Sequence, residues 1–254
     1  MSRVIFIFPP APTRPTENMK PVLMLDNVSR RFGERVALDG LSLTLNEGEV
    51  FALLAPNGAG KTTTLNLILG FLRADGGAIT VCGEPVGGDA AVTGRHIAYL
   101  PEQVAIYPEL SGVENLRYFS LLAAIDLGDG ALRGLLSEAG LQHEAHDRAA
   151  RFYSKGMRQK VGIAIAMARE AKLLLLDEPT SGLDPLAASE LSASLRAASK
   201  RGVAILMATH DLYHIKEVAT RVGFLRGGRI ASEIDPQTTD HAMLEQLYIS
   251  ELGR

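Results

Sequence analysis

The stretch VFALLAPNGAGKTTTLNLILG, residues Val50 to Gly70, passes from an apolar run through a glycine-containing loop into a helix-like run. Its centre follows the pattern G-x-x-x-x-G-K-[ST], in which a loop between a strand and a helix holds the phosphates of a nucleotide. Ala55 stands where that pattern has its first glycine. Alanine is tolerated there if its φ stays negative, because a positive φ strains L-residues. We therefore expect the loop to bind a nucleotide.

The loop offers several kinds of phosphate contact. Gly58 and Gly60 allow successive backbone N–H groups to approach the β- and γ-phosphates, and the following helix N-terminus adds a favourable dipole. Lys61 brings a positive charge to these phosphates, and the Thr62 hydroxyl can ligate Mg²⁺. The residues expected to contact the nucleotide here are Ala55, Pro56, Asn57, Gly58, Ala59, Gly60, Lys61, Thr62 and Thr63. Alone, this motif predicts a nucleotide-binding protein of unspecified kind.

Two adjacent carboxylates follow a second apolar run, in KLLLLDEPTSGLD, residues Lys172 to Asp184. Asp177, at the end of a predicted strand, would hold the Mg²⁺ shell beside a phosphate loop. Glu178 would face the space beyond the γ-phosphate, where it can polarise an attacking water. The other interpretation is a solvated turn after a strand. Four consecutive leucines in front and the phosphate loop upstream favour the catalytic interpretation.

Strand and helix patterns alternate through the middle of the chain. The apolar runs VFALL, KLLLLD and VAILMATH predict strands buried on both faces of a parallel sheet. Helical stretches separate them, and the last begins with Asp184 as N-cap and Pro185 at the first helical position. The predicted helices cover residues 61–70, 156–169 and 185–198. This alternation indicates an α/β fold with a P-loop NTPase core, a parallel sheet flanked by helices.

Two further layers are expected around this core. Residues 22–49 alternate and turn often, which predicts an N-terminal antiparallel β layer. Residues 111–150 have a purely helical pattern, opened by a capping box of Ser111 and Glu114, which predicts a helical insertion subdomain. Gly227 and Gly228 suit a hairpin turn, and a helix from about Thr239 to Leu252 is expected to follow it.

These patterns divide the chain into three parts. Residues 1–19, with VIFIF running into PPAPTRP, are expected to be a disordered leader, and Met19 rivals Met1 as the start. Residues 20–235 are expected to form the nucleotide-binding domain, with the helical subdomain inserted at about residues 103–168. Residues 236–254 are expected to add the short C-terminal helix.

The composition excludes several classes of protein. A formal charge of −3 gives no global basic field, so no nucleic-acid partner is expected. The lone Cys82 excludes an internal disulfide and fits a reducing compartment. No apolar run approaches the roughly 18 residues that span a bilayer. A soluble cytoplasmic protein is therefore expected.

Four further motifs carry a resemblance to the ATPase subunits of ATP-binding-cassette (ABC) transporters, over about residues 22–232. YSKGMRQ is similar to the signature segment of that family, which implies that Ser154 and Gly156 contact a γ-phosphate held by a second subunit. SGLD resembles the loop whose aspartate, here Asp184, crosses the dimer interface. ATHD places His210 at the γ-phosphate, and RRFG places Phe32 where the family stacks an aromatic ring on adenine.

Two motifs depart from the family pattern. The signature is usually leucine-serine-glycine-glycine-glutamine, whereas this chain has Tyr153-Ser154-Lys155-Gly156-Met157 and keeps the serine and the second glycine. The position that is usually a glutamine touching Mg²⁺ and water is Glu102, with Gln103 next. A carboxylate also ligates Mg²⁺, so either residue is a candidate at the metal site.

The resemblance implies a motor subunit that binds and hydrolyses ATP with Mg²⁺. Its expected partners are ATP, a second ABC ATPase subunit and an integral membrane permease, on the cytoplasmic face of the cell membrane. The segments LPE, YPELSGVENL and YSKGMRQ resemble those of ATPases that are paired with separate export-type permeases. In that family, residues 104–107 would dock a permease helix. Two alternatives stay open: a soluble ABC ATPase of the iron–sulfur assembly type, and a regulatory or translation-linked ABC protein.

Some residues are interpreted as structural. HEAHD, residues His143 to Asp147, lacks the zincin spacing H-E-x-x-H and is expected to be a solvated helix end. The isolated histidines His96, His214 and His241 are expected to lie at the surface or in core packing. The aromatic residues Tyr107, Tyr118 and Phe119 are expected to pack within the helical insertion.

Overall fold

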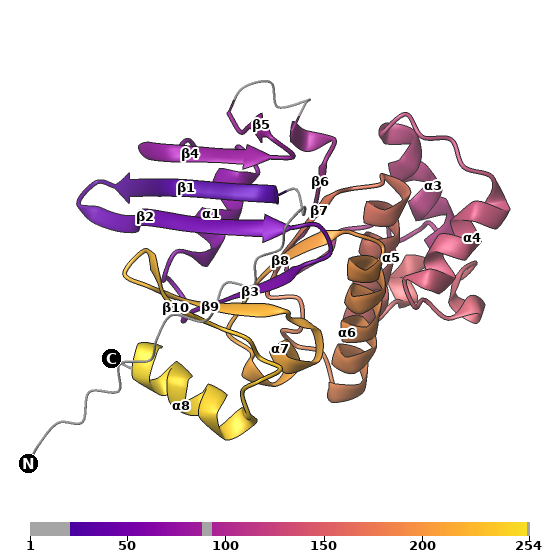
Figure 1. The fold of residues 1–254 in the computed structure, drawn as a ribbon. Helices are drawn as coiled ribbons and strands as arrows, with labels where there is room; N and C mark the ends of the chain where they lie inside the picture. Colours follow the sequence, from indigo (N-terminus) through magenta and orange to yellow (C-terminus); the bar gives the residue numbers. More distant parts are fainter. Residues whose placement is uncertain (1–20, 88–92, 253–254) are drawn as a thin grey trace, which may run out of the picture.

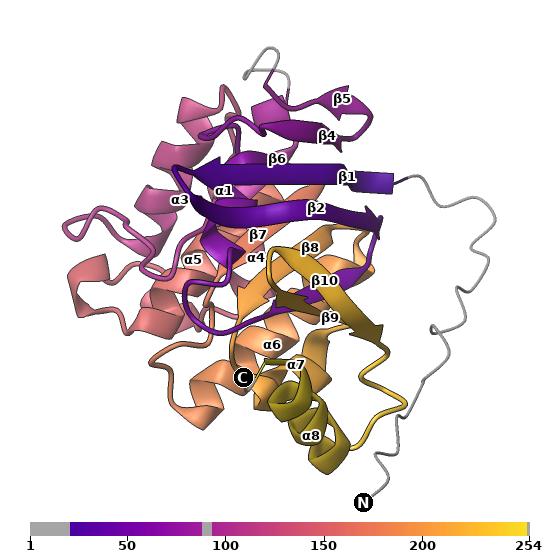
Figure 2. The ribbon, with the colours of Figure 1, turned by 90° about the vertical axis from the view of Figure 1, so that its left-hand side faces the viewer.

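The computed structural model describes residues 21–87 and 93–252, and these form two sheets with helices around them (Figure 1). The expected leader and Met19 lie outside the described residues. The larger sheet has six strands in the order β10-β9-β3-β8-β7-β6, and the smaller has four in the order β2-β1-β4-β5. Both Figure 1 and Figure 2 show the smaller sheet lying over one side of the larger one.

The larger sheet contains the three buried strands that the apolar runs predict. Strands β3 (Val50–Leu54), β8 (Ala204–Thr209) and β7 (Leu173–Asp177) pair in parallel at its centre. Their side chains are buried on both faces, apart from the half-buried Asp177 at the end of β7. Parallel neighbours β6 (Ile97–Leu100) and β9 (Arg221–Arg226) were not predicted as strands of this sheet.

A tight hairpin adds β10 (Arg229–Ile234) to the sheet, antiparallel to β9. Gly227 and Gly228, the two turn residues, have φ of 57° and 77°. Positive φ at both central positions is the requirement of the two-residue hairpin turn whose twist matches its strands. The predicted hairpin is therefore confirmed.

The smaller sheet is the predicted antiparallel layer. Its strands are β1 (Pro21–Phe32), β2 (Arg35–Asn46), β4 (Gly76–Val81) and β5 (Glu84–Pro85). Helix α1 (Lys61–Ile68) lies between the two sheets, because its buried residues Leu65, Leu67 and Ile68 share one apolar core with both. The phosphate loop is thus held at the junction of the two layers.

The helical insertion is less regular than the sequence predicts. Residues 111–150 are not purely helical: they hold α3 (Gly112–Leu122), α4 (Asp129–Glu138), the 3-10 turn η1 (His143–Ala145) and the start of η2 (Ala150–Phe152), joined by loops. The joining segments continue the helical spacing of apolar residues without an α-helical backbone, and sequence patterns alone do not separate the two cases. The capping box of Ser111 and Glu114 is confirmed.

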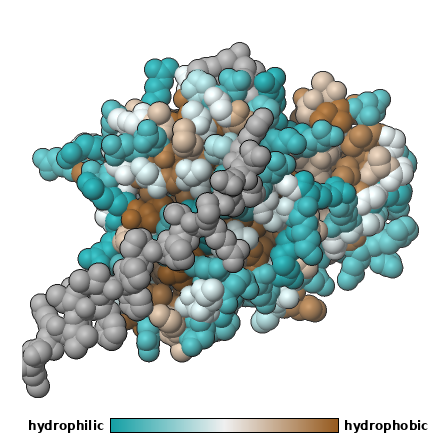
Figure 3. Space-filling model, viewed as in Figure 1, coloured by the Kyte–Doolittle hydropathy of each residue, from teal (hydrophilic) through white to brown (hydrophobic). Residues whose placement is uncertain are grey.

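The remaining helices of the described residues are α5 (Lys155–Ala168), α6 (Pro185–Lys200), α7 (Leu212–Val218) and α8 (His241–Leu252). The predicted cap of α6 is confirmed, since Asp184 accepts a hydrogen bond from the Ala187 N–H. Hydrophobic residues gather over α3 at the right of Figure 3, where Tyr118, Leu121 and Leu122 are exposed. Within residues 21–87 and 93–252, none of the helices has the length and apolar character needed to cross a membrane.

Candidate nucleotide-binding site

The phosphate loop runs from the end of β3 to the start of α1, the context that the motif requires. Gly58 and Gly60 have φ of 80° and 114°. At Gly60, a side-chain β-carbon would lie 2.7 Å from the Ala37 carbonyl oxygen, so glycine is needed for both conformation and space. The backbone N–H groups after Gly60 begin α1 and have no acceptor of their own in the helix.

Ala55 lies before the part of the loop in which glycines adopt positive φ. It is fully buried, its φ is not positive, and its N–H donates to the Thr209 carbonyl of β8 at 3.2 Å. Its carbonyl accepts from Lys61 Nζ at 2.5 Å. The expectation that alanine keeps an ordinary backbone here is confirmed, and the methyl group belongs to the core between the sheets.

We expect Ala55→Gly to change nucleotide affinity by less than about tenfold, which corresponds to about 1.4 kcal/mol. The methyl group touches the core rather than the cavity, so its loss removes no phosphate contact. Isothermal titration with a non-hydrolysable ATP analogue measures the effect. Lys61→Ala is the control, with a much larger expected loss. A large gain in affinity for Ala55→Gly would mean that the natural loop is impaired.

Asp177 and Glu178 both line the cavity beside this loop, although they are adjacent in sequence. Successive residues of a strand point to opposite faces. Glu178 departs from strand geometry, with φ of 46°, while its N–H donates to the Ala208 carbonyl at 2.8 Å. Left-handed backbone is costly for a glutamate and is found where a surrounding structure enforces it, often at functional sites. This turn brings both carboxylates to one side.

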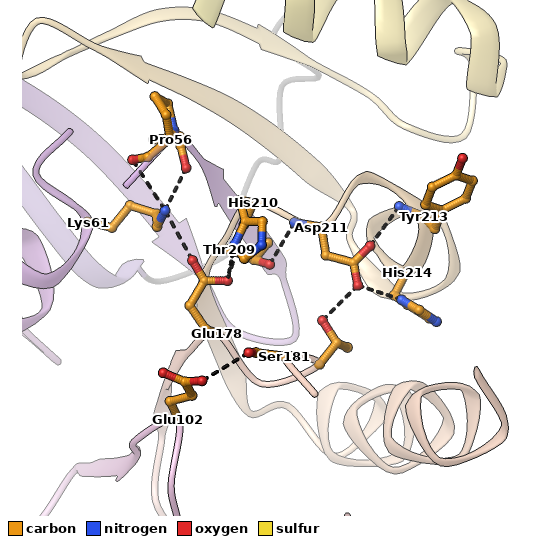
Figure 4. Close-up of polar contacts among 12 residues, drawn as sticks. Pro56, Lys61, Glu102, Glu178, Ser181, Thr209, His210, Asp211, Tyr213 and His214 are labelled. Carbon is orange, nitrogen blue, oxygen red and sulfur yellow. Dashed lines mark hydrogen bonds and ion pairs between the residues drawn. The ribbon is translucent and has the colours of Figure 1, made fainter. Parts of the chain in front are cut away.

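Glu178 is joined to two other predicted catalytic residues (Figure 4). Its Oε1 lies 3.1 Å from Lys61 Nζ, and its Oε2 lies 2.8 Å from His210 Nδ1. A carboxylate only accepts, so Nδ1 donates, which leaves Nε2 as the ring atom available to a phosphate. Burial raises the pKa of Glu178, but hydrogen bonds from His210 and Lys61 outweigh it, and the pKa lies below its usual value. The carboxylate is therefore ionised at neutral pH.

The cavity has a volume of about 320 Å³ and extends from the phosphate loop to the β1–β2 turn. Phe32, the predicted adenine-stacking residue, lines it and is 44% exposed. The Arg30 guanidinium lies 4.8 Å from the Phe32 ring centroid. The lining residues are Phe32, Arg35, Ala37, Asn57, Gly58, Gly60, Lys61, Thr62, Thr63, Glu102, Asp177 and Glu178.

Oxygen donors suited to Mg²⁺ line this cavity. Thr62, Asp177 and Glu102 are all among the residues that line it. Burial, with the nearby Glu178 and Glu102 carboxylates, raises the pKa of Asp177 against the opposing effects of Lys61 and Thr62. Crowded carboxylates of this kind fit a hard divalent cation. Gln103, the other candidate at this position, is not among the lining residues.

The signature residues and Asp184 do not line this cavity. Ser154 caps α5, and its hydroxyl accepts from the Met157 N–H. A β-carbon on Gly156 would lie 3.5 Å from the Ala187 side chain of α6. Asp184 and Ser154 therefore begin two neighbouring helices. The structure of one chain brings them close to each other but not to the phosphate loop.

Residues 38–181 match the family model described as ABC transporter. This chain is an ATPase of the ABC transporter family. Chains of this family are the ATP-hydrolysing subunits that drive transporters, and ATP hydrolysis is therefore the activity of this one. The motif resemblance seen in the sequence is confirmed.

Relatives of this ABC ATPase include export proteins. Nod factor export ATP-binding protein I of Burkholderia lata is 36% identical over 239 residues, 92% of this chain and 75% of the relative. Linearmycin resistance ATP-binding protein LnrL of Bacillus subtilis is 31% identical over 211 residues, 82% and 68% of the two chains. These names favour neither the iron–sulfur assembly type nor the translation-linked type.

Solved structures of this family share the fold. An ATP-binding subunit of an ABC transporter is 29% identical, with a TM-score of 0.76 over 90% of this chain and 98% of the other. CbiO1 of Clostridium perfringens is 24% identical, with a TM-score of 0.77 over 90% and 95%. The P-loop core with its antiparallel layer is therefore the fold of this ABC ATPase.

Sequence reasoning missed part of the ABC ATPase site. Arg35 pairs with Phe32 across the β1–β2 turn, lines the cavity, and donates to the Gly58 carbonyl at 2.6 Å. A basic residue three positions after the aromatic that is predicted to stack on adenine was the available signal. The interpretation of His214 as isolated is wrong: its Nδ1 lies 2.6 Å from Asp211 Oδ2, which also accepts from the Thr180 hydroxyl.

The HEAHD segment makes contacts within the insertion. Its buried His146 has Nε2 3.1 Å from the Leu141 carbonyl oxygen, and Asp147 pairs with Arg133. The aromatic residues Tyr107, Tyr118 and Phe119 form a cluster as predicted, although Tyr107 and Tyr118 keep 46% and 38% of their surface exposed.

Proposed function

We propose that the cavity binds Mg²⁺-ATP and that Glu178 acts as the general base of its hydrolysis. The observation that carries this proposal is the linked set of Lys61, Glu178 and His210 at the end of the phosphate loop. The adenine stacks on Phe32, and the loop amides with Lys61 hold the phosphates. Asn57, Thr63 and the other loop residues named from the sequence complete the contacts.

The ion pair of Lys61 with Glu178 suggests how the base is activated. Both side chains are largely buried, with 6% and 13% of their surface exposed. A triphosphate attracts Lys61 more strongly than one carboxylate does, so ATP binding draws the ammonium away from Glu178. The pKa of Glu178 then rises towards that of an effective base, while His210 Nδ1 still orients the carboxylate. Binding of substrate thereby prepares the residue that polarises the water.

The Thr62 hydroxyl, the Asp177 carboxylate and the Glu102 carboxylate are the residues that would hold Mg²⁺. The ion supplies charge stabilisation for the phosphate oxygens. Glu102 is preferred to Gln103 because its side chain lines the cavity. Asp177 stays ionised in this role because the cation offsets the neighbouring carboxylates.

The active site is completed by a second ABC ATPase subunit. Ser154 and Gly156 of one chain contact the γ-phosphate held by the other, and Asp184 crosses the interface. Two observations support this arrangement: these residues do not line their own cavity, and related cassettes form dimers, as in a dimeric ABC transporter cassette of TM-score 0.72 and 22% identity. Closure of the pair on ATP supplies the motion.

The motion passes to an export-type membrane permease on the cytoplasmic face of the membrane. Residues 104–107 lie in the loop between β6 and α3, and Asn115 fixes this loop by donating to the Tyr107 and Leu110 carbonyls. The Tyr107 ring contacts the ring of Tyr118 in α3. Tyr118, Leu121 and Leu122 of this helix are exposed. An exposed apolar face of this kind suits a protein partner.

The test is co-purification from detergent-solubilised membranes. A tagged chain should retain an integral membrane protein, encoded beside it, and ATP turnover should rise in the complex. Tyr107→Glu should abolish the retention while ATP binding stays unchanged. Ile249→Glu, at a residue of α8 that is 61% exposed, is the matched control and should retain the partner. Failure of the natural chain to retain any membrane protein would contradict the transporter role.

A further inference from the structure

A polar link joins three segments next to the nucleotide cavity, at Glu102 after β6, Lys155 in α5 and Ser181 after β7. The Ser181 hydroxyl donates to Glu102 Oε1 at 2.9 Å, as Figure 4 shows. Lys155 Nζ lies 3.6 Å from the same oxygen and donates to the Ser181 carbonyl at 2.5 Å. The lysine therefore contacts both the carboxylate and the residue that holds it.

Lys155 has a defined place in this link. A β-carbon on Gly182 would lie 3.9 Å from Lys155 Nζ, so the ammonium lies across the Ser181–Gly182 backbone. The Lys155 side chain is 27% exposed, which means that it lies against the protein instead of extending into water. Holding so flexible a side chain costs conformational entropy, and the contacts with Glu102 and Ser181 offset that cost.

The charge balance of the cavity gives the link its role. Three carboxylates line the cavity, Asp177, Glu178 and Glu102, and its ligand is a polyanion. Lys61 pairs with Glu178, and Lys155 pairs with Glu102. Glu102 and Lys155 are also the two charged residues that stand where the family pattern has glutamine and glycine. The additional negative charge of Glu102 and the additional positive charge of Lys155 therefore form an ion pair in the structure.

We propose that Lys155 is a positioning residue of the nucleotide site that holds the Glu102 carboxylate and offsets its charge. This inference rests on the proposed function, namely that the cavity takes ATP. Without Lys155, an uncompensated carboxylate faces the phosphates, and like charges repel in a partly buried site. With a neutral residue at position 102, Lys155 has no charge to offset and its removal has little effect.

The test measures ATP affinity in a double-mutant cycle at low ionic strength, with ATP alone in excess EDTA and again with Mg²⁺. Lys155→Met should weaken ATP binding by about threefold to tenfold, the range of a partly exposed ion pair beside a polyanion. Added salt should reduce the difference, because it screens the repulsion. Glu102→Gln with Lys155→Met should bind ATP within about twofold of Glu102→Gln alone.

Controls separate charge from structure. Lys155→Arg should restore affinity, and Lys200→Met, which removes an exposed lysine at the end of α6, should leave affinity unchanged. An equal loss for Lys155→Met in both backgrounds would overturn the proposal, whether the cause is a structural role or a direct contact of Lys155 with phosphate. Unchanged affinity of Lys155→Met would also overturn it. If the natural chain fails to bind ATP, the proposed function itself fails.

Discussion

Glu178→Gln is expected to lower ATP turnover by roughly 10²–10⁴-fold, the range for removing a general base. ATP binding should be kept and even tightened, because the neutral amide no longer competes with the phosphates for Lys61, which lies 3.1 Å from the carboxylate. ATP should therefore trap the variant as a nucleotide-bound dimer. Turnover by phosphate release, affinity by titration and size-exclusion chromatography with ATP measure these three effects.

Comparison with Asp211→Asn separates the roles of the neighbouring carboxylates. Asp211 pairs with His214 and Thr180, not with Lys61, so this change should not tighten ATP binding. Near-normal hydrolysis in Glu178→Gln would refute the assignment of the base.

Ser154→Arg is expected to abolish hydrolysis, although Ser154 is outside the cavity of its own chain. The substitution puts bulk and charge where the γ-phosphate of the second subunit would be contacted. Binding of ATP to the monomer should remain nearly unchanged, because the phosphate loop, Lys61 and Phe32 are untouched. Steady-state turnover and titration of a non-hydrolysable analogue distinguish the two quantities.

Mixing Ser154→Arg with Lys61→Ala extends this prediction. In a mixed dimer, one composite site has an intact phosphate loop facing an intact signature segment. Some activity should return on mixing, although each variant alone is inactive. If mixing restores nothing while mixed dimers form, the two halves of a site do not come from different chains.

Most of the core could be predicted because its signals are local. The residues from Val50 to Gly70 predict a strand, a turn and a helix from their own pattern. Asp184 predicts the start of α6, because it is a typical N-cap residue. The irregular insertion could not be predicted in detail, because segments such as residues 139–149 keep an apolar period without forming an α-helix. The nature of these elements depends on what packs against them.

The candidate site also has a part that local motifs predict and a part that depends on the surrounding structure. Motifs located Lys61, Asp177 and Glu178, but the positive φ that turns Glu178 towards Asp177 depends on the surrounding structure. The cavity position of Arg35 depends on the register of the β1–β2 hairpin. The contact between Glu102 and Lys155 joins residues far apart in sequence, and no single motif contains both.

The dependence of specific activity on protein concentration tests the central claim most directly, that each ATP is hydrolysed between two chains. The purified chain should show low specific activity when dilute, a rise with concentration, and a plateau once dimers dominate. The oligomeric state is measured in the same samples by light scattering. Constant specific activity across a dilution of about a hundredfold, in a chain shown to be monomeric throughout, would contradict the shared site.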